Sequence, residues 1–143
     1  MNTDPAFHYR RRVQFAETDL AGIVHFSWYF RYMEEAEHAL WRAAGLTIER
    51  AGADTGWPRV AAAFDYKHPL HFEDEFVDHV RILKVGSRSI RYAHTFLRGD
   101  TLIGTGAITT VHVRKQPDAS MTSAEIPENI IARLQSAVQT TVA

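Results

Sequence analysis

Apolar and polar positions alternate along most of this chain, which predicts strands, and one long segment switches to the helical period. Residues 7–15 alternate except at Arg11, which breaks the pattern, so we expect this strand to be an edge or exposed. In residues 28–44 the apolar side chains recur at helical spacing, with Ser27 as the expected N-cap and Gly45 at the expected C-terminal stop. The first third of the chain therefore predicts a strand, a loop and one long helix.

The second half of the chain predicts strands joined by tight turns, and then a short helix that begins at Pro127. The strands are expected at 60–66, 76–85, 90–96 and 102–113, with turns at 86–87 and 99–100. In the last strand, Ile103, Ala107, Val111 and Val113 are expected to share one face. Tight turns join antiparallel neighbours, so residues 1–143 predict a single α+β domain whose long helix covers one face of an antiparallel sheet. The uncovered face and the sheet edges predict association with further copies.

Composition narrows the class of protein. Hydrophobic residues make up 45% of the chain and charged residues 23%, which is typical of a soluble globular domain. Lys and Arg number 16 against 17 Asp and Glu, so a nucleic-acid-binding module with a basic excess is not expected. There is no cysteine, which excludes disulfides, thiolate nucleophiles and iron–sulfur clusters. No apolar run is long enough for a membrane span and the start, MNTDPAFHYRRR, lacks a signal-peptide core, so we expect a cytoplasmic protein.

The segment DLAGIVHFS, residues 19–27, joins the first strand to the long helix and carries the candidate chemistry. Asp19 lies a few residues before a helix start, where free amides bind anions or polarise a carbonyl. Gly22 lets the backbone approach a ligand closely. A carboxylate beside a polarised carbonyl is the minimum for acyl transfer or hydrolysis. The ordinary structural alternative is that Asp19 forms an Asx-turn, Gly22 supplies a positive φ and His25 packs on the helix start.

Four segments of the chain resemble one family. FAETDLAGIVHF, residues 15–26, closely resembles the signature of the 4-hydroxybenzoyl-CoA thioesterase family. WYFRYMEEA at 28–36, YKHPLHFED at 66–74 and VGSRSI at 85–90 are similar to its following segments. The resemblance spans nearly the whole chain. It implies the hotdog fold, in which a five-stranded antiparallel sheet wraps around one long central helix.

The same resemblance implies a mechanism. Asp19 matches the family's catalytic carboxylate, which acts either as a nucleophile on the thioester carbonyl or as a general base on water. An amide near His25, Phe26 or Ser27 would polarise the carbonyl. His25 has either a catalytic role or a packing role at the helix start. The site would lie at a homodimer interface, with the dimers paired into a homotetramer.

The substrate-binding residues are expected in two places. Coenzyme A carries phosphates, which need cations and hydroxyls, and the resemblance places these at Ser87, Arg88 and Ser89. A solvated hairpin is the alternative for this cluster. The acyl group would bind beside the helix start, near Gly22, Phe26, Ser27, Trp57, Ala62 and Ala63. Aromatic side chains in that group favour an aromatic acyl chain.

The remaining polar residues have more ordinary interpretations. Glu17 either forms a working pair of carboxylates with Asp19 or is a solvated neighbour of it, and we expect the second. Glu34 and Glu35 lie on the polar helix face, and we expect them to pair with Arg31 or His38 rather than to act in catalysis. His68 and His71 lie three residues apart in the segment HPLH, and this pair lacks a third ligand, so no metal is expected.

These observations together predict an acyl-CoA thioesterase that needs no metal or other cofactor, because coenzyme A is part of its substrate. The first alternative is a hotdog hydratase or dehydratase, whose histidine–acid signatures are not visible. The second is a non-catalytic acyl-CoA-binding protein, such as the sensing half of a regulator. Such regulators carry a DNA-binding domain, for which the chain has no room before its first strand. The identity of the acyl group stays open.

Overall fold

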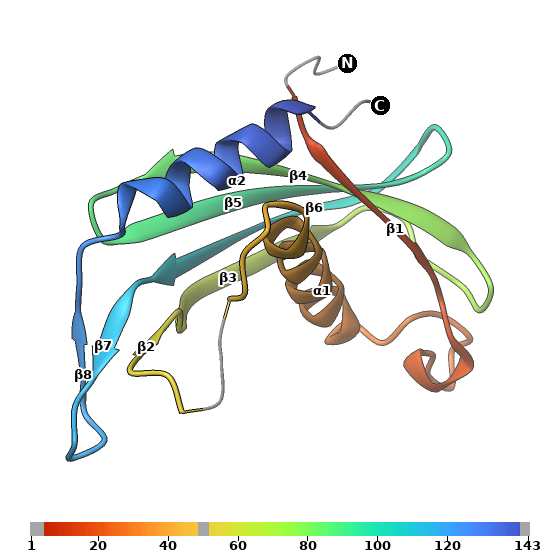
Figure 1. The fold of residues 1–143 in the computed structure, drawn as a ribbon. Coiled ribbons are helices and arrows are strands. Elements are labelled where there is room, and N and C mark those ends of the chain that lie inside the picture. The colour runs from red at the N-terminus through yellow and green to blue at the C-terminus, as the bar shows by residue number, and fades with distance from the viewer. Residues whose placement is uncertain (1–4, 49–51, 141–143) are drawn as a thin grey trace.

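The computed structural model describes residues 5–48 and 52–140, and its main sheet has five antiparallel strands. The strands lie in the order β1-β4-β5-β6-β3, so β1 and β3 form the edges (Figure 1). Their bounds are β1 Phe7–Arg12, β3 Arg59–Tyr66, β4 Glu75–Val85, β5 Ser89–Arg98 and β6 Thr101–Val111. The strands expected in the second half of the chain therefore occur, with small differences at their ends.

Both α-helices pack on the same face of this sheet (Figure 1). Helix α1, Trp28–Ala43, covers an aromatic core with its first half, and helix α2, Glu128–Thr140, packs beside its second half. The first core comprises Val13, Val24, Tyr29, Tyr32, Met33, Phe64, Leu70, Phe76, Phe96, Ile103 and Ile108. No helix in residues 5–48 and 52–140 covers the opposite face of the sheet, as the sequence predicts.

The ends of α1 lie where the sequence predicts them, but the N-terminal end is not capped as expected. Ser27 occupies the N-cap position without a capping hydrogen bond from its side chain. At the other end, Gly45 follows the C-cap with φ +76°, a conformation that glycine adopts without strain. The start of α1 is therefore held by the preceding loop, whose geometry is described below.

The first strand is an edge of the sheet, as the break at Arg11 predicts, but it departs from the expected pattern in two details. β1 ends at Arg12, and Phe15 lies 74% exposed in a short 3-10 turn, η1 Phe15–Glu17. Arg11 does not leave the strand exposed: its side chain is only 14% exposed and faces α1, where it pairs with Glu17 and Glu35. A charged residue can occupy an inner position when it is paired, which the alternation of apolar residues does not reveal.

The inner face of β6 was also predicted wrongly. Ile103 and Val113 are buried as expected, but Ala107 and Val111 are only half-buried. The inner face instead carries Gly106 and Ile108, because a register shift in the β5–β6 ladder changes the alternation. A Cβ on Gly106 would lie 2.5 Å from Met33 Sδ, so this glycine allows α1 to approach the sheet. Glycine gives no hydrophobic signal, and the buried face could therefore not be read from periodicity.

A second, small sheet was not predicted. It contains three short strands in the order β2-β7-β8, with bounds β2 Thr55–Gly56, β7 Val113–Lys115 and β8 Met121–Ser123. The sequence predicts one continuous strand through residue 113 and an irregular segment at 48–57. Residues 49–51 of that segment, like residues 1–4 and 141–143 of the predicted domain, lie outside the described part of the chain.

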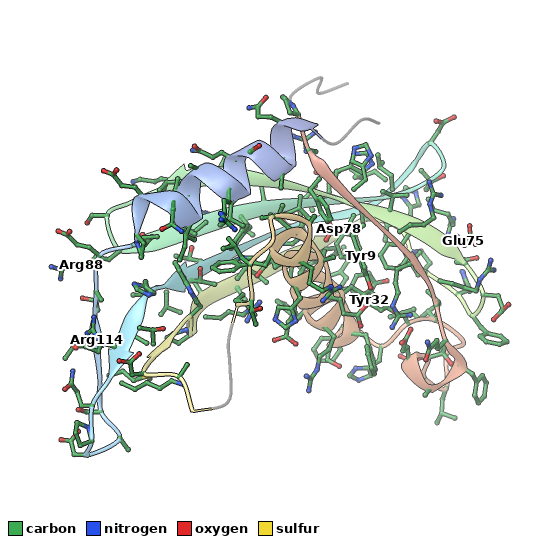
Figure 2. The ribbon with its side chains drawn as sticks, in the orientation of Figure 1. Tyr9, Tyr32, Glu75, Asp78, Arg88 and Arg114 are labelled. Atoms are coloured by element: carbon green, nitrogen blue, oxygen red, sulfur yellow. The ribbon has the colours of Figure 1, made fainter. Side chains whose placement is uncertain are left out.

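A buried polar cluster fastens the middle of α1 to the sheet, and we call Glu37, Asp78, His94 and Arg59 the core cluster. Asp78 lies on β4 over the middle of α1 (Figure 2), and its Oδ2 lies 2.6 Å from His94 Nδ1. The other ring nitrogen of His94 lies 2.7 Å from Glu37 Oε2, and Arg59 donates to Glu37 Oε1 at 2.9 Å. Burial lowers the pKa of His94, but its carboxylate partners outweigh burial and raise that pKa to about 9. A histidinium therefore lies between carboxylates in the interior.

The edge strand β3 is poorly covered. Val60 is 60% exposed, and Ala61, Ala62 and Ala63 are exposed as well. An exposed apolar edge strand favours pairing with another chain, and the association expected from the sequence stays a prediction. None of the helices in residues 5–48 and 52–140 has the length and apolar character needed to span a membrane.

Candidate active site

Asp19 lies at the tip of a small hairpin-like loop between η1 and α1. Its amide donates to Ile23 O at 2.9 Å, and Gly22 N donates back to Asp19 O at 2.9 Å. The Asp19 carboxylate accepts a hydrogen bond from Ala21 N at 2.8 Å through Oδ1. The Asx-turn expected as the ordinary interpretation is thus present, and it engages one carboxylate oxygen only.

Gly22 has φ +81°, and a Cβ at this position would meet no atom within 4 Å. The glycine is therefore required by the turn rather than by close packing, and the space above it is open. Both interpretations of Gly22 from the sequence, a positive φ and an unobstructed backbone, agree with this geometry.

The Asp19 loop borders a cleft of about 510 Å³ whose walls are mainly aromatic and apolar. Phe26 from the loop, Tyr29 from α1 and Tyr66 from the end of β3 line it together with Asp19. The full lining is Asp19, Ile23, Val24, Phe26, Tyr29, Tyr66, Lys67, His68 and Pro69. A single carboxylate in an apolar cleft of this size is a suitable site for a small acyl group.

The amides at the start of α1 are not equivalent. His25 N donates to Glu17 O at 2.9 Å, and Ser27 N donates to His25 Nδ1 at 3.3 Å, so both are engaged. Phe26 N has no hydrogen-bond acceptor among residues 5–48 and 52–140. The hydroxyl of Tyr66 donates to Phe26 O at 2.9 Å, which lies in the next peptide group along the chain. Of the three expected amides, Phe26 N is the one free to polarise a bound carbonyl.

His25 is half-buried, and its ring packs on Phe26 with the ring centroids 4.6 Å apart. Its Nδ1 lies 2.8 Å from Ser27 Oγ, and within the described residues no hydrogen bond or ion pair joins His25 to Asp19. These contacts correspond to the packing role at the helix start that the sequence left open. Ser27 itself lines a smaller cavity of about 210 Å³ together with Ala62.

Glu17 is not the solvated residue that we expected. It is 2% exposed and receives hydrogen bonds from Arg11, Tyr32 and the amide of Gln14. Burial alone would raise its pKa, but these donors outweigh burial and lower it. Glu17 is thus a buried anion two residues from Asp19.

The helix glutamates have the structural roles expected, with one change of partner. Glu34 lies 4.0 Å from Arg31 and 3.5 Å from Arg59. Glu35 accepts hydrogen bonds from Arg11 Nε at 2.8 Å and from the Tyr9 hydroxyl at 2.9 Å, and not from His38. Neither residue lines the Asp19 cleft.

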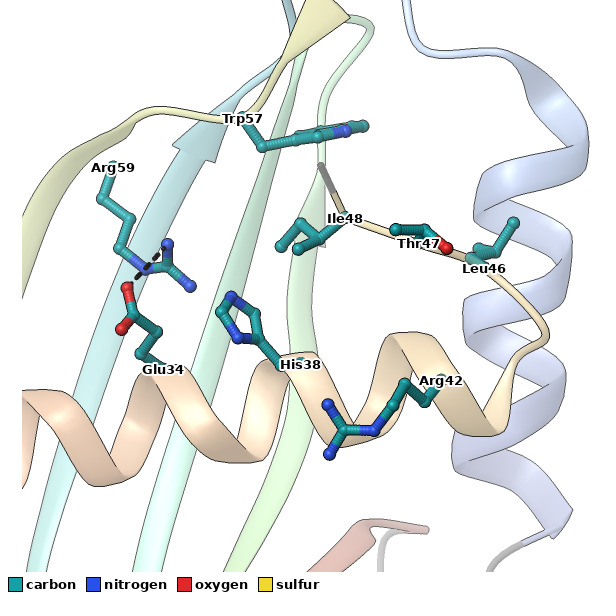
Figure 3. A pocket seen from close by; sticks show the side chains of 8 residues that line it. All are labelled: Glu34, His38, Arg42, Leu46, Thr47, Ile48, Trp57 and Arg59. Atoms are coloured by element: carbon teal, nitrogen blue, oxygen red, sulfur yellow. Dashed lines mark ion pairs between the residues drawn. The ribbon is translucent and has the colours of Figure 1, made fainter. Parts of the chain in front are cut away.

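Trp57 and Ala63 do not lie in the Asp19 cleft, contrary to expectation. Trp57 is 8% exposed, packs edge-on against Trp41 and borders a separate pocket of about 470 Å³ over α1. Figure 3 shows this pocket, with the ion pair between Glu34 and Arg59 at one side. Ala63 is exposed on β3 opposite Ala107. The loop before β3 carries Trp57 to the far half of α1, and no pattern in the sequence indicates the path of that loop.

The proposed phosphate-binding residues are remote from Asp19 within one chain. Ser87 and Arg88 form the turn between β4 and β5, and Ser89 begins β5. This turn and the Asp19 loop lie at opposite ends of the sheet (Figure 1). Arg88 Nη1 donates to Ser123 Oγ at 3.1 Å and is exposed (Figure 2). One chain alone does not join these residues to the cleft.

Tyr66, Lys67 and His68 were not selected as site residues from the sequence, although they fall in one of its quoted segments. His68 Nδ1 lies 2.8 Å from the carbonyl oxygen of Leu102, which leaves Nε2 as the unbonded ring nitrogen. Tyr66 ends β3, and His68 directly precedes Pro69 in the segment beside the cleft; the proline after the strand was the available signal. His71 pairs with Asp74 instead, and residues 5–48 and 52–140 hold no metal-binding group of side chains.

Comparison with known proteins agrees with this geometry. Residues 13–134 match the family model of the thioesterase-like superfamily. A protein of Aquifex aeolicus (strain VF5) is 37% identical over 99 residues, which are 68% of this chain and 77% of that protein. The 1,4-dihydroxy-2-naphthoyl-CoA hydrolase of Parasynechococcus marenigrum (strain WH8102) is 35% identical over 80 residues, 50% of this chain and 53% of the hydrolase.

Among solved structures, a gentisyl-coenzyme A thioesterase has a TM-score of 0.79 and 28% identity, with 89% of this chain and 98% of that chain covered. The fold and the matched relatives define a hotdog protein of the thioester hydrolase class. The chain belongs to the thioesterase-like superfamily. These matches do not single out the 4-hydroxybenzoyl-CoA branch that the sequence motifs resemble.

Proposed function

We propose that this protein hydrolyses an acyl-CoA thioester to a free acid and coenzyme A, with Asp19 as the reacting carboxylate. The observation that carries the proposal is the cleft itself: Asp19 and Phe26 both line this aromatic-walled space, and Phe26 N has no hydrogen-bond acceptor within residues 5–48 and 52–140. The thioester carbonyl would accept a hydrogen bond from Phe26 N, which stabilises the oxyanion of the tetrahedral intermediate. The acyl group would lie against Tyr29 and Tyr66.

Two routes through Asp19 balance chemically. As a general base, Asp19 takes a proton from water, the hydroxide oxygen bonds to the carbonyl carbon, and the C–S bond breaks with the proton passing to the departing thiolate. As a nucleophile, Asp19 forms a mixed anhydride with release of the thiol, and water then hydrolyses the anhydride. The free oxygen of the Asp19 carboxylate, opposite the Asx-turn bond, serves either route.

An aromatic acyl group is the proposed substrate class. The cleft offers Phe26, Tyr29 and Tyr66 as flat apolar surfaces, and aromatic rings pack well against one another. The gentisyl-coenzyme A thioesterase and the 1,4-dihydroxy-2-naphthoyl-CoA hydrolase that the chain is similar to are named for aromatic substrates. No cofactor is proposed, because the carboxylate, the amide and water supply every step.

The working form is proposed to be a homodimer, paired further into a homotetramer in the cytoplasm. The support is twofold: β3 presents an exposed apolar edge, and Ser87, Arg88 and Ser89 lie at the other end of the sheet from Asp19. A second copy would bring such a basic turn to the cleft and complete a coenzyme A site.

The test measures free thiol released from benzoyl-, hydroxybenzoyl-, phenylacetyl-, dihydroxynaphthoyl- and fatty acyl-CoA. The chain has no cysteine, so it adds no thiol background. Turnover on one or more aromatic members supports the proposal and ranks the acyl groups. Calorimetric binding of these thioesters without thiol release would instead establish a non-catalytic acyl-CoA-binding protein. Release from fatty acyl members alone would overturn the aromatic assignment.

A further inference from the structure

The side-chain carboxylate of Glu17 accepts hydrogen bonds from three different residues. Arg11 Nη2 donates to Glu17 Oε2 at 2.6 Å, the Tyr32 hydroxyl donates to Oε1 at 2.7 Å, and Gln14 N donates to Oε1 at 2.9 Å. The donors come from β1, α1 and the turn before η1. One carboxylate therefore joins the separate parts of the structure that meet at the Asp19 loop.

The backbone of Glu17 closes the same loop. Its carbonyl accepts from His25 N at 2.9 Å, and the adjacent Thr18 forms a bridge with Val24. Asp19 follows directly, with its own amide bonded to Ile23 O. Glu17 thus fixes both the beginning of the loop, through its side chain, and the end of the loop next to Phe26, through its carbonyl.

The partners of Glu17 are themselves fixed. Arg11 Nε donates to Glu35 at 2.8 Å, and the Tyr9 hydroxyl donates to Glu35 at 2.9 Å (Figure 2). The Arg11 guanidinium lies 5.0 Å from the centre of the Tyr32 ring. We call Arg11, Glu17, Tyr32 and Glu35 the loop cluster. Hydrophobic contacts resist sliding of a helix only weakly because they are not directional, whereas these short hydrogen bonds fix one relative position.

The pKa shifts of Arg11 and Tyr32 favour a single charge state of the loop cluster. Burial alone would lower the pKa of Arg11, but the hydrogen bonds to Glu35 and Glu17 outweigh it and raise the pKa. Burial and the neighbouring Glu17 both raise the pKa of Tyr32, so its hydroxyl keeps the proton that it donates. The loop cluster therefore keeps the same hydrogen bonds throughout the neutral range of pH.

We propose that Glu17 is a positioning residue, which holds the Asp19 carboxylate and the Phe26 amide at a fixed separation by clamping the loop between β1 and α1. The inference rests on the proposed function, because it assigns Glu17 to the reaction of the Asp19 cleft. Glu17 touches no cleft space itself, since it is buried and absent from the cleft lining. Its effect on the reaction is exerted through the geometry of the loop.

The test replaces Glu17 by Gln, which keeps the shape but removes the anion that Arg11 requires. A misplacement of about 1 Å at a reacting group costs on the order of 100-fold in rate. We expect kcat of Glu17→Gln to fall about 10- to 100-fold, with KM changed less than about threefold, because the apolar walls that bind the acyl group are intact. Amide hydrogen exchange of residues 18–25 is expected to become faster.

The matched control is Glu75→Gln. Glu75 on β4 pairs with Arg12, which lies on the outer face of β1, the strand that also carries Arg11. The side chains of Glu75 and Arg12 are 47% and 54% exposed. This variant removes the same charge beside a β1 arginine and should leave kcat, KM and loop exchange unchanged. Tyr32→Phe removes only the hydroxyl that donates to Glu17, and it replaces Glu17→Gln as the test variant if Glu17→Gln does not fold. We expect an intermediate fall in kcat from it, with the same small change in KM.

Unchanged kcat in both Glu17→Gln and Tyr32→Phe would overturn the proposal, as would a rise in KM without a fall in kcat. Failure of the proposed function has a different signature, namely no thiol release from the unaltered protein. Amide hydrogen exchange of residues 18–25 still tests the proposed role of Glu17 in that case. Faster exchange at residues 18–25 in Glu17→Gln, but not in Glu75→Gln, supports the clamp; equal exchange in both variants contradicts it.

Discussion

Two buried polar clusters fasten α1 to the sheet, and they differ in what else they touch. The loop cluster joins Glu17 to α1 and β1, and Glu17 lies two residues from Asp19. The core cluster joins Glu37 to β4 and β5, where Asp78 and His94 are 0% exposed. Neither cluster lines the Asp19 cleft, but only the loop cluster adjoins the loop that carries Asp19. The comparison separates a cluster that we propose positions the Asp19 loop from a cluster that holds the interior of the protein together.

The largest expected loss in the free energy of unfolding comes from a change in the core cluster. His94→Gln removes the cation and leaves Asp78 and Glu37 facing each other's charge in the interior. Breaking a buried ion pair by removing one partner costs about 3–5 kcal/mol. We expect urea unfolding to show a loss of that order in the free energy of unfolding, while kcat of the folded variant stays within about twofold. A large fall in kcat without a stability loss would erase the distinction between the clusters.

A second expectation concerns pH and sharpens the same distinction. The pKa of His94 is raised from 6.5 to about 9, so its charged form stabilises the folded state. That contribution is complete below pH 6.5 and is lost progressively as pH rises to about 9. The gap between these pKa values corresponds to roughly 3 kcal/mol as an upper bound. Urea midpoints measured from pH 6 to 10 should fall along this range in the unaltered protein and lose this fall in His94→Gln.

The groups that face His94 set the interpretation of that experiment. They are Glu37 from α1, Asp78 from β4 and, through Glu37, Arg59 from β3. Burial raises the pKa of Asp78 against the lowering effect of His94, so the cluster titrates as a unit. A stability that rises between pH 6.5 and 9 would contradict the assignment of the charge to His94.

The smallest expected effect is at the surface. Glu75→Gln breaks the exposed pair with Arg12 and should change the free energy of unfolding by less than about 0.5 kcal/mol. The same urea experiment measures it. A loss comparable to that of His94→Gln would show that burial is not what separates these ion pairs.

The sequence predicted elements better than it predicted the residues on their faces. Ile90, Tyr92, His94 and Phe96 are all buried on β5 as alternation requires. Alternation failed at Arg11, because a paired charge takes an apolar position. It failed on β6 as well, where glycine carries no signal. The small sheet β2-β7-β8 has strands too short for any periodicity.

The candidate site residues also divide into those that a local sequence motif indicates and those that depend on contacts between distant segments. Asp19, Gly22 and Phe26 were selected because the loop is continuous in sequence and carries a motif. Asp19 and Phe26 line one cleft and Gly22 has the positive φ of the turn, while their roles in the reaction stay predictions. Trp57 was misplaced because its side chain crosses to the far half of α1, which depends on the path of a loop. Glu17 was misread as solvated because its partners, Arg11 and Tyr32, lie on other elements. Long-range pairing of this kind has no signal in a single sequence.

The most direct test of the account is the turnover of Asp19→Asn on the best acyl-CoA substrate. Asp118→Asn is its matched control, because Asp118 Oδ1 also accepts from the amide two residues on, Ser120 N, at 3.0 Å in an exposed turn. Loss of a general base or nucleophile predicts that thiol release falls about 100- to 10,000-fold in Asp19→Asn, with an unchanged unfolding midpoint and full activity in Asp118→Asn. Thiol release by Asp19→Asn at the rate of the unaltered protein would contradict the central claim.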